Sequence, residues 1–313
     1  MKPQEPVRAK ITVIIPTCNG ERYLGALLDS VQAQTRAADE IIVVDSASTD
    51  STLDIVRAYP QVQLLQIERA HFDHGGTRTL VAKMSLGDIL VFLTQDAIPA
   101  NNLAIAQLVA PLEQEGNIAV TYGRQLPHSD ASPFAAHLRL FNYPNIAEIP
   151  RCFADRARLG LKTIFCSNSF AAYRRKELAE AGFFPERLLL GEDSFAVAKI
   201  LQLGYCAQYM SEATVFHSHN YTAWEEAKRY FDVGAFHANS RELLQTYGTA
   251  KSTGRQFVFS ELAYLYTRKH FSFLPLSAIR SGSKLLAYHL GRRAAKLPRF
   301  LKRRLSMHPD WWQ

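Results

Sequence analysis

Residues 11–45 read ITVIIPTCNGERYLGALLDSVQAQTRAADEIIVVD and contain a strand–helix–strand unit. Residues 11–16 and 41–45 are continuous apolar, β-branched runs, which predict strands buried on both faces. The helical pattern between them covers residues 21–35, with apolar side chains at Tyr23, Leu24, Leu27, Leu28 and Val31. A helix that connects two buried strands predicts a parallel sheet covered by helices on both faces.

The same alternation continues through the first 124 residues. Ser48 or Thr49 is placed to cap a second helix, and residues 76–85 predict a third. Further strands are predicted over residues 62–67, 89–94 and 119–124.

The second half of the chain is less regular. We expect short strands over residues 170–173 and 213–217, and a helix over residues 193–203 that Gly204 ends. From Trp224 onward the pattern is mainly helical.

These patterns predict an α/β fold: a Rossmann-like, mostly parallel central sheet with helices on both faces, plus a C-terminal helical extension. We expect one domain over residues 1–223, with halves at 1–124 and 125–223, and a helical region over residues 224–313.

The composition argues for a folded, non-spanning protein. The 313 residues are 47% hydrophobic and 21% charged, which argues against disorder, collagen and coiled coil. No apolar run reaches the roughly 18–20 residues of a spanning helix, and residues 1–6 lack the apolar segment of a signal peptide. The four cysteines form no CxxC pair and no zinc spacing, which favours a reduced, cytosolic compartment: Cys18, Cys152, Cys166 and Cys206.

Polar residues follow three of the predicted strands. They are Thr17-Cys18-Asn19, Asp45-Ser46 and Thr94-Gln95-Asp96. In an open α/β sheet the ligand lies beyond the carboxyl ends of the strands, so these residues are candidates for a shared site. Asp96 is suited to a hard divalent cation, or alternatively to a turn or helix cap. Asp45 is suited to a pyrimidine N3–H or a ribose hydroxyl, or alternatively to capping the next helix.

Two further candidates lie on predicted helices. Arg78 follows Gly75-Gly76 at a helix start, where backbone N–H groups and a guanidinium suit phosphate oxygens; the alternative is a solvated arginine. Glu192-Asp193 opens another helix and is either a first-turn acid pair or a general base.

His217 and His219 alternate along the last predicted strand, which would aim both imidazoles at one face. An HxH pair completes some metal sites, although most such pairs are ordinary polar contacts. A Walker loop, a GxGxxG and a GxSxG elbow are all absent from the sequence, which argues against those nucleotide and hydrolase sites.

The net charge of +7 is concentrated near the end of the chain. Residues 284–304 hold eight Lys or Arg and no acid, so the rest is close to neutral. Apolar residues recur among these cations at helical spacing, with Pro298 as a break: Leu286, Leu290, Ala294, Leu297 and Leu301. This pattern is typical of a helix on anionic lipid. The alternatives are a basic face packed on the protein and a nucleic-acid patch; no nucleic-acid motif accompanies the charge, so we expect no nucleic-acid partner.

Taken in order, these segments resemble family 2 glycosyltransferases with the GT-A fold, over about residues 10–240. The matching segments are residues 14–20, residues 41–50, Thr94-Gln95-Asp96 at the position of the metal-binding DxD, and Gly191-Glu192-Asp193 at that of the catalytic base. Within the family, the sequence is most similar to bacterial rhamnosyltransferases. The segments that carry this likeness are residues 72–78, Ser167-Asn168-Ser169, residues 217–221 and Phe231-Asp232-Val233-Gly234.

The resemblance implies transfer of L-rhamnose, with inversion, from dTDP-β-L-rhamnose to a lipid-linked glycan acceptor in surface polysaccharide synthesis. It implies a nucleotide-binding half at 1–124, an acceptor-binding half at 125–223, and an enzyme peripheral on the cytoplasmic face of the inner membrane. Asp193 would be the base, and Asn168, Glu192 and Trp224 would lie on the acceptor side. Donor contacts would come from Thr17, Asn19, Asp45, Arg78, Gln95 and Asp96.

Two motifs depart from the family pattern. Its DDGS is Asp45-Ser46-Ala47-Ser48 here, and its DxD retains only Asp96 as a carboxylate. We therefore expect Asp96 to hold Mg²⁺ or Mn²⁺ with help from His217 or His219, and the sequence leaves open which histidine completes the metal shell. The alternatives are the same fold with a UDP-hexose donor and a non-catalytic module that binds nucleotide and membrane.

Overall fold

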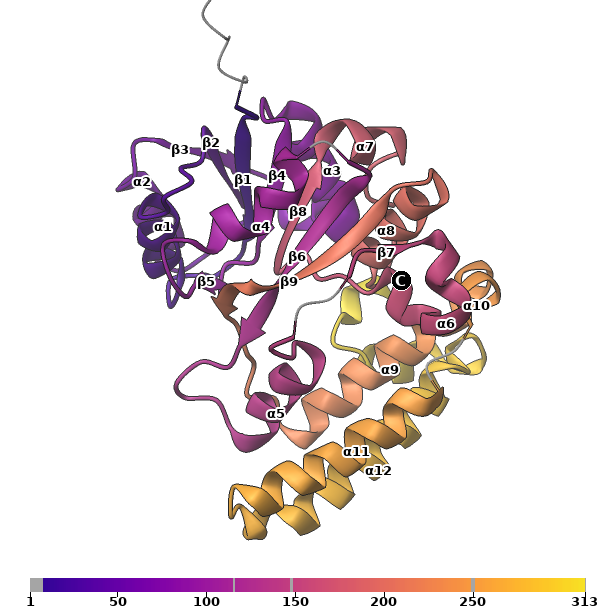
Figure 1. The fold of residues 1–313 in the computed structure, drawn as a ribbon. Coiled ribbons are helices and arrows are strands. Elements are labelled where there is room, and N and C mark those ends of the chain that lie inside the picture. Colours follow the sequence, from indigo (N-terminus) through magenta and orange to yellow (C-terminus); the bar gives the residue numbers. More distant parts are fainter. Residues whose placement is uncertain (1–7, 115, 147–148, 249–250, 313) are drawn as a thin grey trace, which may run out of the picture.

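The computed structural model describes residues 8–114, 116–146, 149–248 and 251–312 (Figure 1). The expectation of no signal peptide concerns residues 1–6, which lie outside the described part of the chain.

The core of the molecule is a nine-stranded sheet of order β3-β2-β1-β4-β8-β6-β9-β5, with β7 also paired to β9. Strands β1 to β4 are parallel to one another; β8 is antiparallel to both β4 and β6, and β9 is parallel to β6. Strands β6 and β9 therefore run in the same direction as β1 to β4, and the predicted mostly parallel sheet is confirmed. The strands are β1 (Ile11–Thr17), β2 (Glu40–Asp45), β3 (Val62–Gln66), β4 (Ile89–Leu93), β5 (Ile98–Pro99), β6 (Ile118–Leu126), β7 (Arg151–Cys152), β8 (Phe170–Arg174) and β9 (Cys206–Phe216).

Helices cover both faces of the sheet, as predicted. Side chains alternate along a strand, so Val13 and Ile15 pack on one face while Ile14 packs on the other. The first face is covered by α1 (Leu24–Gln32), α2 (Thr52–Arg57) and α4 (Ala104–Glu113). The second is covered by α3 (His74–Met84) and α8 (Glu192–Gln202).

Two local predictions in this part were wrong. Helix α2 begins after Ser51, not after Ser48 or Thr49, because Ser48 bonds to Asp45 instead. Strand β9 begins at Cys206, seven residues earlier than expected, and it ends at Phe216. His217 and His219 therefore follow the strand and do not alternate along it. The less regular second half contains α5 (Pro133–Asn142) and α6 (Arg156–Leu159), and α7 (Arg175–Glu180) follows β8.

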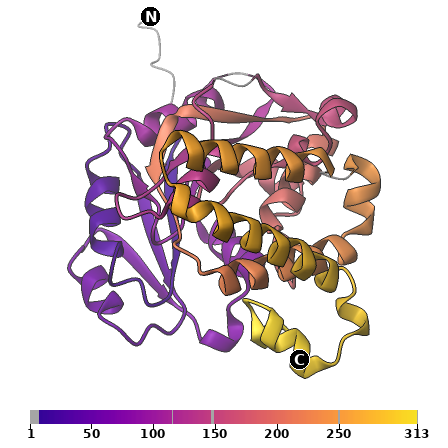
Figure 2. The same cartoon turned by 90° about the horizontal axis from the view of Figure 1, so that it is seen from below.

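The C-terminal part is helical, as expected, and α9 starts at residue 223, next to the boundary predicted after that residue. Helices α9 and α12 pack backbone to backbone, and a Cβ on Gly234 or Gly291 would collide with the opposite helix. Figure 2 shows α11 and α12 side by side across this end of the molecule. The helices are α9 (Ala223–Asn239), α10 (Arg241–Tyr247), α11 (Lys251–Thr267), α12 (Leu274–Gly291) and α13 (Arg299–Leu305).

The apolar stripe predicted over residues 284–304 does not form one helix. Helix α12 ends at Gly291, and Leu290, Ala294 and Leu297 pack against the cluster beneath α9. Lys284 is only 5% exposed, with its Nζ 3.8 Å from a Glu226 oxygen. A packed basic face, one of the alternatives, therefore accounts for part of this segment. Within the described residues, no helix combines the length and the apolar character that crossing a bilayer requires.

Cys152 and Cys206 form a disulfide, contrary to the expectation of reduced cysteines. The antiparallel register of β7 and β9 places these two residues opposite each other although 54 positions separate them. Spacing along the chain carries no trace of that pairing. Cys18 and Cys166 are free.

Candidate active site

The predicted strand-end residues meet at one edge of the sheet. Strands β1, β2, β4, β6 and β9 all end there, and the antiparallel strand β8 begins there. This edge carries Thr17, Asp45, Asp96 and His217 at strand ends, and Asn168 just before β8.

The side chain of Gln95 connects the loop after β1 to the end of β4 by hydrogen bonds. Its Oε1 accepts hydrogen bonds from the Thr17 hydroxyl (2.7 Å) and the Cys18 amide (2.8 Å), and its Nε2 donates to the Cys18 carbonyl (3.1 Å). Thr17 and Gln95 therefore hold each other in place.

Asp45 and Asn19 organise the adjoining loops. Asp45 is completely buried and accepts hydrogen bonds from both the amide and the hydroxyl of Ser48. Asn19 is exposed and accepts from the Thr49 amide (2.9 Å). In this conformation the Asp45 carboxylate does not reach the surface, so it shapes the loop and is enclosed by it. Asp45 does not cap α2, because the N-cap of that helix is Ser51, so the alternative of helix capping is wrong.

Asp96, His217 and His219 converge into a candidate metal centre. Their ligand atoms all lie within 4.8 Å of one another. Asp96 Oδ1 is 3.5 Å from His217 Nε2, and Asp96 Oδ2 is 3.6 Å from His219 Nδ1. One carboxylate and two imidazoles form a donor set that suits a divalent transition-metal ion.

The surroundings of His217 fix its tautomer. Its Nδ1 lies 2.8 Å from Gln125 Oε1, an oxygen that also accepts from Arg139 Nη1 (2.6 Å). Because an arginine only donates, this contact identifies the Gln125 atom as the acceptor, and His217 Nδ1 must carry the proton. The lone pair of Nε2 then points toward Asp96, which is the arrangement found in metal-binding histidines.

The protonation states also suit a cation. Burial lowers the pKa of His217 to about 3, so the imidazole is neutral at pH 7. Burial alone would raise the pKa of Asp96, but attraction to the protonated forms of His217 and His219, together with hydrogen bonds, outweighs it, and the pKa lies below its ordinary value. Neutral imidazole and ionised carboxylate are the forms that bind metals.

Arg78 and Glu192 form a buried ion pair across α3 and α8. Their side chains approach to 3.1 Å, and both residues are less than a tenth exposed. Burial would raise the pKa of Glu192, but Arg78 and then His74 outweigh it, and the pKa is lowered. Glu192 is therefore ionised and holds Arg78 in place.

At the start of α3, where the sequence suggested an anion site, the carboxylate of Asp73 takes the place of an external anion. Asp73 caps the helix by accepting from the Gly76 amide (2.6 Å), so a carboxylate already occupies this end. Gly75 is required for another reason: a Cβ there would collide with the Pro185 carbonyl. The two glycines therefore permit close packing and do not leave an open phosphate cradle.

Asp193 lies next to the Arg78–Glu192 ion pair and is half-buried at the start of α8. Burial, and then the adjacent Glu192 charge, raises the pKa of Asp193 to about 7. A carboxyl group with this pKa exchanges a proton readily at neutral pH, as a general base must.

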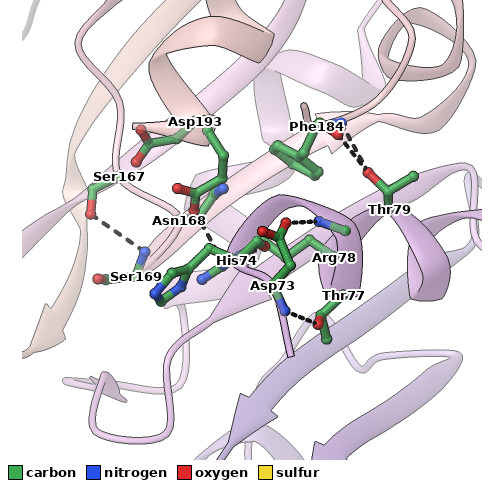
Figure 3. A network of polar contacts seen from close by, with 12 residues as sticks. Asp73, His74, Thr77, Arg78, Thr79, Ser167, Asn168, Ser169, Phe184 and Asp193 are labelled. Atoms are coloured by element: carbon green, nitrogen blue, oxygen red, sulfur yellow. Dashed lines mark hydrogen bonds and ion pairs between the residues drawn. The ribbon is translucent and has the colours of Figure 1, made fainter. Parts of the chain in front are cut away.

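The loop at residues 167–169 connects the candidate metal centre with the site around Arg78, Glu192 and Asp193. Ser167 accepts from Gln125 Nε2 (3.1 Å), and Gln125 in turn holds His217. Asn168, 3% exposed, accepts from the Tyr173 hydroxyl (2.8 Å) and follows Ser167 directly. Figure 3 shows Ser167 and Asn168 beside Asp193. Trp224, in contrast, lies on α9 with its ring half exposed, and its neighbour is Lys228.

Sequence reasoning missed several residues at this edge. Gln125 and Arg139 fix His217; His74 lies against the Arg78–Glu192 pair; and His128 Nε2 lies 3.2 Å from the Asp96 carbonyl. His74 lies within residues 72–78, which the sequence likeness had already singled out, whereas Gln125, Arg139 and His128 carry no comparable signal.

Comparisons with known proteins agree with this geometry. Residues 12–182 match the sequence model of glycosyl transferase family 2. The O-antigen chain rhamnosyltransferase RfbN of Salmonella typhimurium is 44% identical over 304 residues, covering 97% of this chain and 96% of the relative. WbaN of Salmonella anatum, another O-antigen chain rhamnosyltransferase, is 41% identical over 303 residues, covering 96% and 95%.

Solved structures show the same architecture. The mannosyltransferase PcManGT from Pyrobaculum calidifontis, in complex with GDP-Man and Mn²⁺, aligns with a TM-score of 0.59 at 20% identity, covering 98% of this chain and 91% of that one. Glucosyl-3-phosphoglycerate synthase from Mycobacterium tuberculosis, with Mn²⁺, UDP-Glc and glycerol 3-phosphate, gives 0.52 at 20% identity, covering 77% and 80%. The fold is thus GT-A, and the protein is a glycosyltransferase. The chain belongs to glycosyl transferase family 2, as the sequence motifs led us to expect.

Proposed function

We propose that this protein transfers L-rhamnose from dTDP-β-L-rhamnose to a lipid-linked glycan acceptor during O-antigen synthesis. The chain-long 44% identity to an O-antigen rhamnosyltransferase is the observation that carries the choice of sugar. The dTDP donor and the lipid link are our extension of it.

Asp193 is the proposed base. It would take the proton from the acceptor hydroxyl while the oxygen attacks the anomeric carbon on the face opposite the departing dTDP. Its pKa of about 7 supports this assignment, because the carboxylate is both populated and basic at neutral pH. Arg78, held by Glu192, would face negative charge that develops on the leaving diphosphate.

Asp96, His217 and His219 would hold Mg²⁺ or Mn²⁺. A bound divalent ion would offset the charge of the donor diphosphate. The convergence of the three side chains and the fixed tautomer of His217 support this fit. Thr17, Asn19 and Gln95 would shape the pocket for base and ribose, and Asp45 would act through the loop it holds. We keep 1–124 as the donor half and 125–223, with Asn168 and Glu192, as the acceptor half. Trp224, just beyond this range, would also lie on the acceptor side.

We propose that the α11–α12 hairpin, extending the segment 284–304, rests on the cytoplasmic face of the inner membrane. Residues 254–304 contain a single acid, Glu261, which is 1% exposed and accepts a hydrogen bond from Ser277. The exposed surface of this hairpin therefore combines cations with apolar side chains and no exposed carboxylate. Its exposed apolar residues are Phe259, Tyr266, Phe271, Leu276, Ile279, Leu285 and Leu286. Its exposed cations are Arg255, Arg268 and Lys269, with Arg292 and Arg293 just beyond.

That combination fits an anionic lipid surface better than a neutral one. On each helix the exposed apolar side chains repeat at a spacing of seven, Phe259 with Tyr266 and Ile279 with Leu286, which places each pair on one side. An acceptor anchored in lipid would be presented at the same surface.

The donor assignment is tested by thermal stabilisation with dTDP, UDP and GDP, each with and without Mg²⁺ or Mn²⁺. We expect the largest metal-dependent stabilisation with dTDP. Product mass after incubation with dTDP-L-rhamnose or with UDP-hexoses then identifies the transferred sugar. Turnover with a UDP-hexose alone would replace the rhamnose assignment, and binding without any turnover would favour the non-catalytic alternative.

A further inference from the structure

The C-terminal segment, defined as residues 306–312, folds back onto one turn of α9. The Met307 amide donates to Asp232 Oδ2 at 2.8 Å, and the Trp312 ring lies 5.9 Å from the Phe231 ring. Phe231 and Asp232 are fully buried, and Ser306 is 1% exposed. The segment is therefore anchored at two points, both within the sequence Phe231-Asp232-Val233-Gly234.

Between these anchors, His308 reaches the candidate active site. Its ring packs edge to face on His74, with the ring centroids 5.6 Å apart and the planes at 87°. His74 is the first residue of α3, and its carbonyl accepts a hydrogen bond from Arg78 Nη1 (2.9 Å). Arg78 carries the ion pair to Glu192, next to Asp193.

We infer that His308 is a positioning residue of this active site: the anchored C-terminal segment seats its ring on His74 and so keeps the Arg78–Glu192 pair in place beside Asp193. The kinetic part of this inference rests on the proposed function; the structural part does not.

The packing has an electrostatic consequence. The charged and titratable groups that face His74 are Asp73 and Arg78 on α3, Glu192 on α8, Arg229 on α9 and His308 itself. Burial, followed by the Arg78 charge, lowers the pKa of His74 below 6.5. A neutral His74 leaves the Glu192 carboxylate to Arg78, whereas a charged imidazole would compete for it. Covering His74 is thus a way to preserve the ion pair.

The test uses the full-length protein and four variants. His308→Ala removes the ring, His308→Phe keeps an aromatic edge, and a chain ending at Leu305 removes the segment. Asp310→Asn changes an exposed carboxylate two positions away and serves as the matched control. His74 is followed by its ring resonances in an NMR pH titration, assigned among the ten histidines with a His74→Gln variant.

We expect His308→Ala and the shortened chain to raise the pKa of His74 toward 6.5 and to reduce kcat about tenfold or more, with KM for the donor within about threefold. His308→Phe should restore most of both properties, and Asp310→Asn should match the wild type. An unchanged His74 titration in His308→Ala, or a His308→Phe variant as impaired as His308→Ala, would overturn the inference. If the wild-type protein transferred no rhamnose, the proposed function would fail while the titration still decided the role of His308.

Discussion

Glu192 and Asp193 are consecutive residues whose carboxyl pKa values are shifted in opposite directions. Burial would raise the pKa of Glu192, but the Arg78 charge outweighs it and the pKa is lowered, whereas burial and the Glu192 charge raise the pKa of Asp193 to about 7. One carboxylate thus holds an arginine permanently, and the other is free to exchange a proton. Separated pKa values in neighbouring acids are typical of sites that need one acid of each kind.

Asp193→Asn should reduce turnover by about 10²–10⁴ and leave donor binding largely intact, because an amide cannot accept the acceptor proton. Calorimetric donor titration and single-turnover product formation measure the two effects. Because the pKa of Asp193 is raised in the native state, its ionisation lowers the free energy of unfolding as the pH rises from about 4 to about 7. Asparagine does not ionise and so removes this cost. The variant should therefore melt no lower than the wild type at pH 8, which controls for misfolding. Transfer close to the wild-type rate would refute the base assignment.

The kcat–pH profile should fall as the pH drops through about 7, because the base must be ionised. Glu192→Gln removes a negative neighbour, so the pKa of Asp193 should decrease and the acid limb should move to lower pH. The same change leaves Arg78 buried without its partner, at a cost of about 3–5 kcal/mol of unfolding free energy. Profiles are compared at a temperature where both proteins are folded; an acid limb that stays in place would argue that another group controls it.

Removal of divalent metal with EDTA should abolish transfer, and Mg²⁺ or Mn²⁺ should restore it. Gln125→Leu should weaken metal binding by about 10–100-fold, because His217 loses the acceptor that fixes its tautomer. Gln125→Glu keeps an acceptor at this position and should retain tighter binding than Gln125→Leu. His289→Ala, at an exposed histidine on α12, is the control. Equal metal affinity in Gln125→Leu and the wild type would contradict the proposed centre.

Much of the fold was predictable because buried parallel strands and amphipathic helices have distinct periods. The unit over residues 11–45 was enough to indicate the sheet, and the strand ends then indicated one edge of it. Asp96, His217 and His219 could be grouped from the sequence because a single remaining carboxylate needed other ligands. The geometry was less predictable: the histidines converge on Asp96 from the loop after β9, not from alternate positions along it.

The features that were not predictable from the sequence depend on contacts between residues far apart in the chain. His308 meets His74, and Cys152 meets Cys206, through register and helix packing that leave no local pattern. Lys284 looks like a surface cation in the sequence, yet it lies buried beside Glu226 because α12 packs on α9. Charge counts alone do not distinguish a packed basic face from an exposed one.

Thiol titration tests the disulfide. The denatured, unreduced protein should show two thiols, those of Cys18 and Cys166, and four after reduction. In the native state only Cys18 should react readily, since Cys166 is buried. Closing a loop of 54 residues is worth about 4 kcal/mol in the chain-entropy description, so reduction should lower the melting temperature. Four thiols before reduction, in protein purified without reductant, would show that the pair is not joined.

The α11–α12 hairpin should bind anionic vesicles through its exposed apolar side chains. The double variant Ile279→Ser/Leu286→Ser removes two side chains that are each 64% exposed, so the fold should be little affected. Because each side chain would lose apolar burial in the lipid, the partition coefficient should fall at least about tenfold. Leu86→Ser is the matched control: Leu86 is 71% exposed but follows α3, far from the hairpin in sequence. Co-sedimentation with vesicles rich in phosphatidylglycerol measures the effect, and binding should weaken with salt because cations contribute to it. Equal sedimentation of the double variant and the control would place the membrane contact elsewhere or remove it.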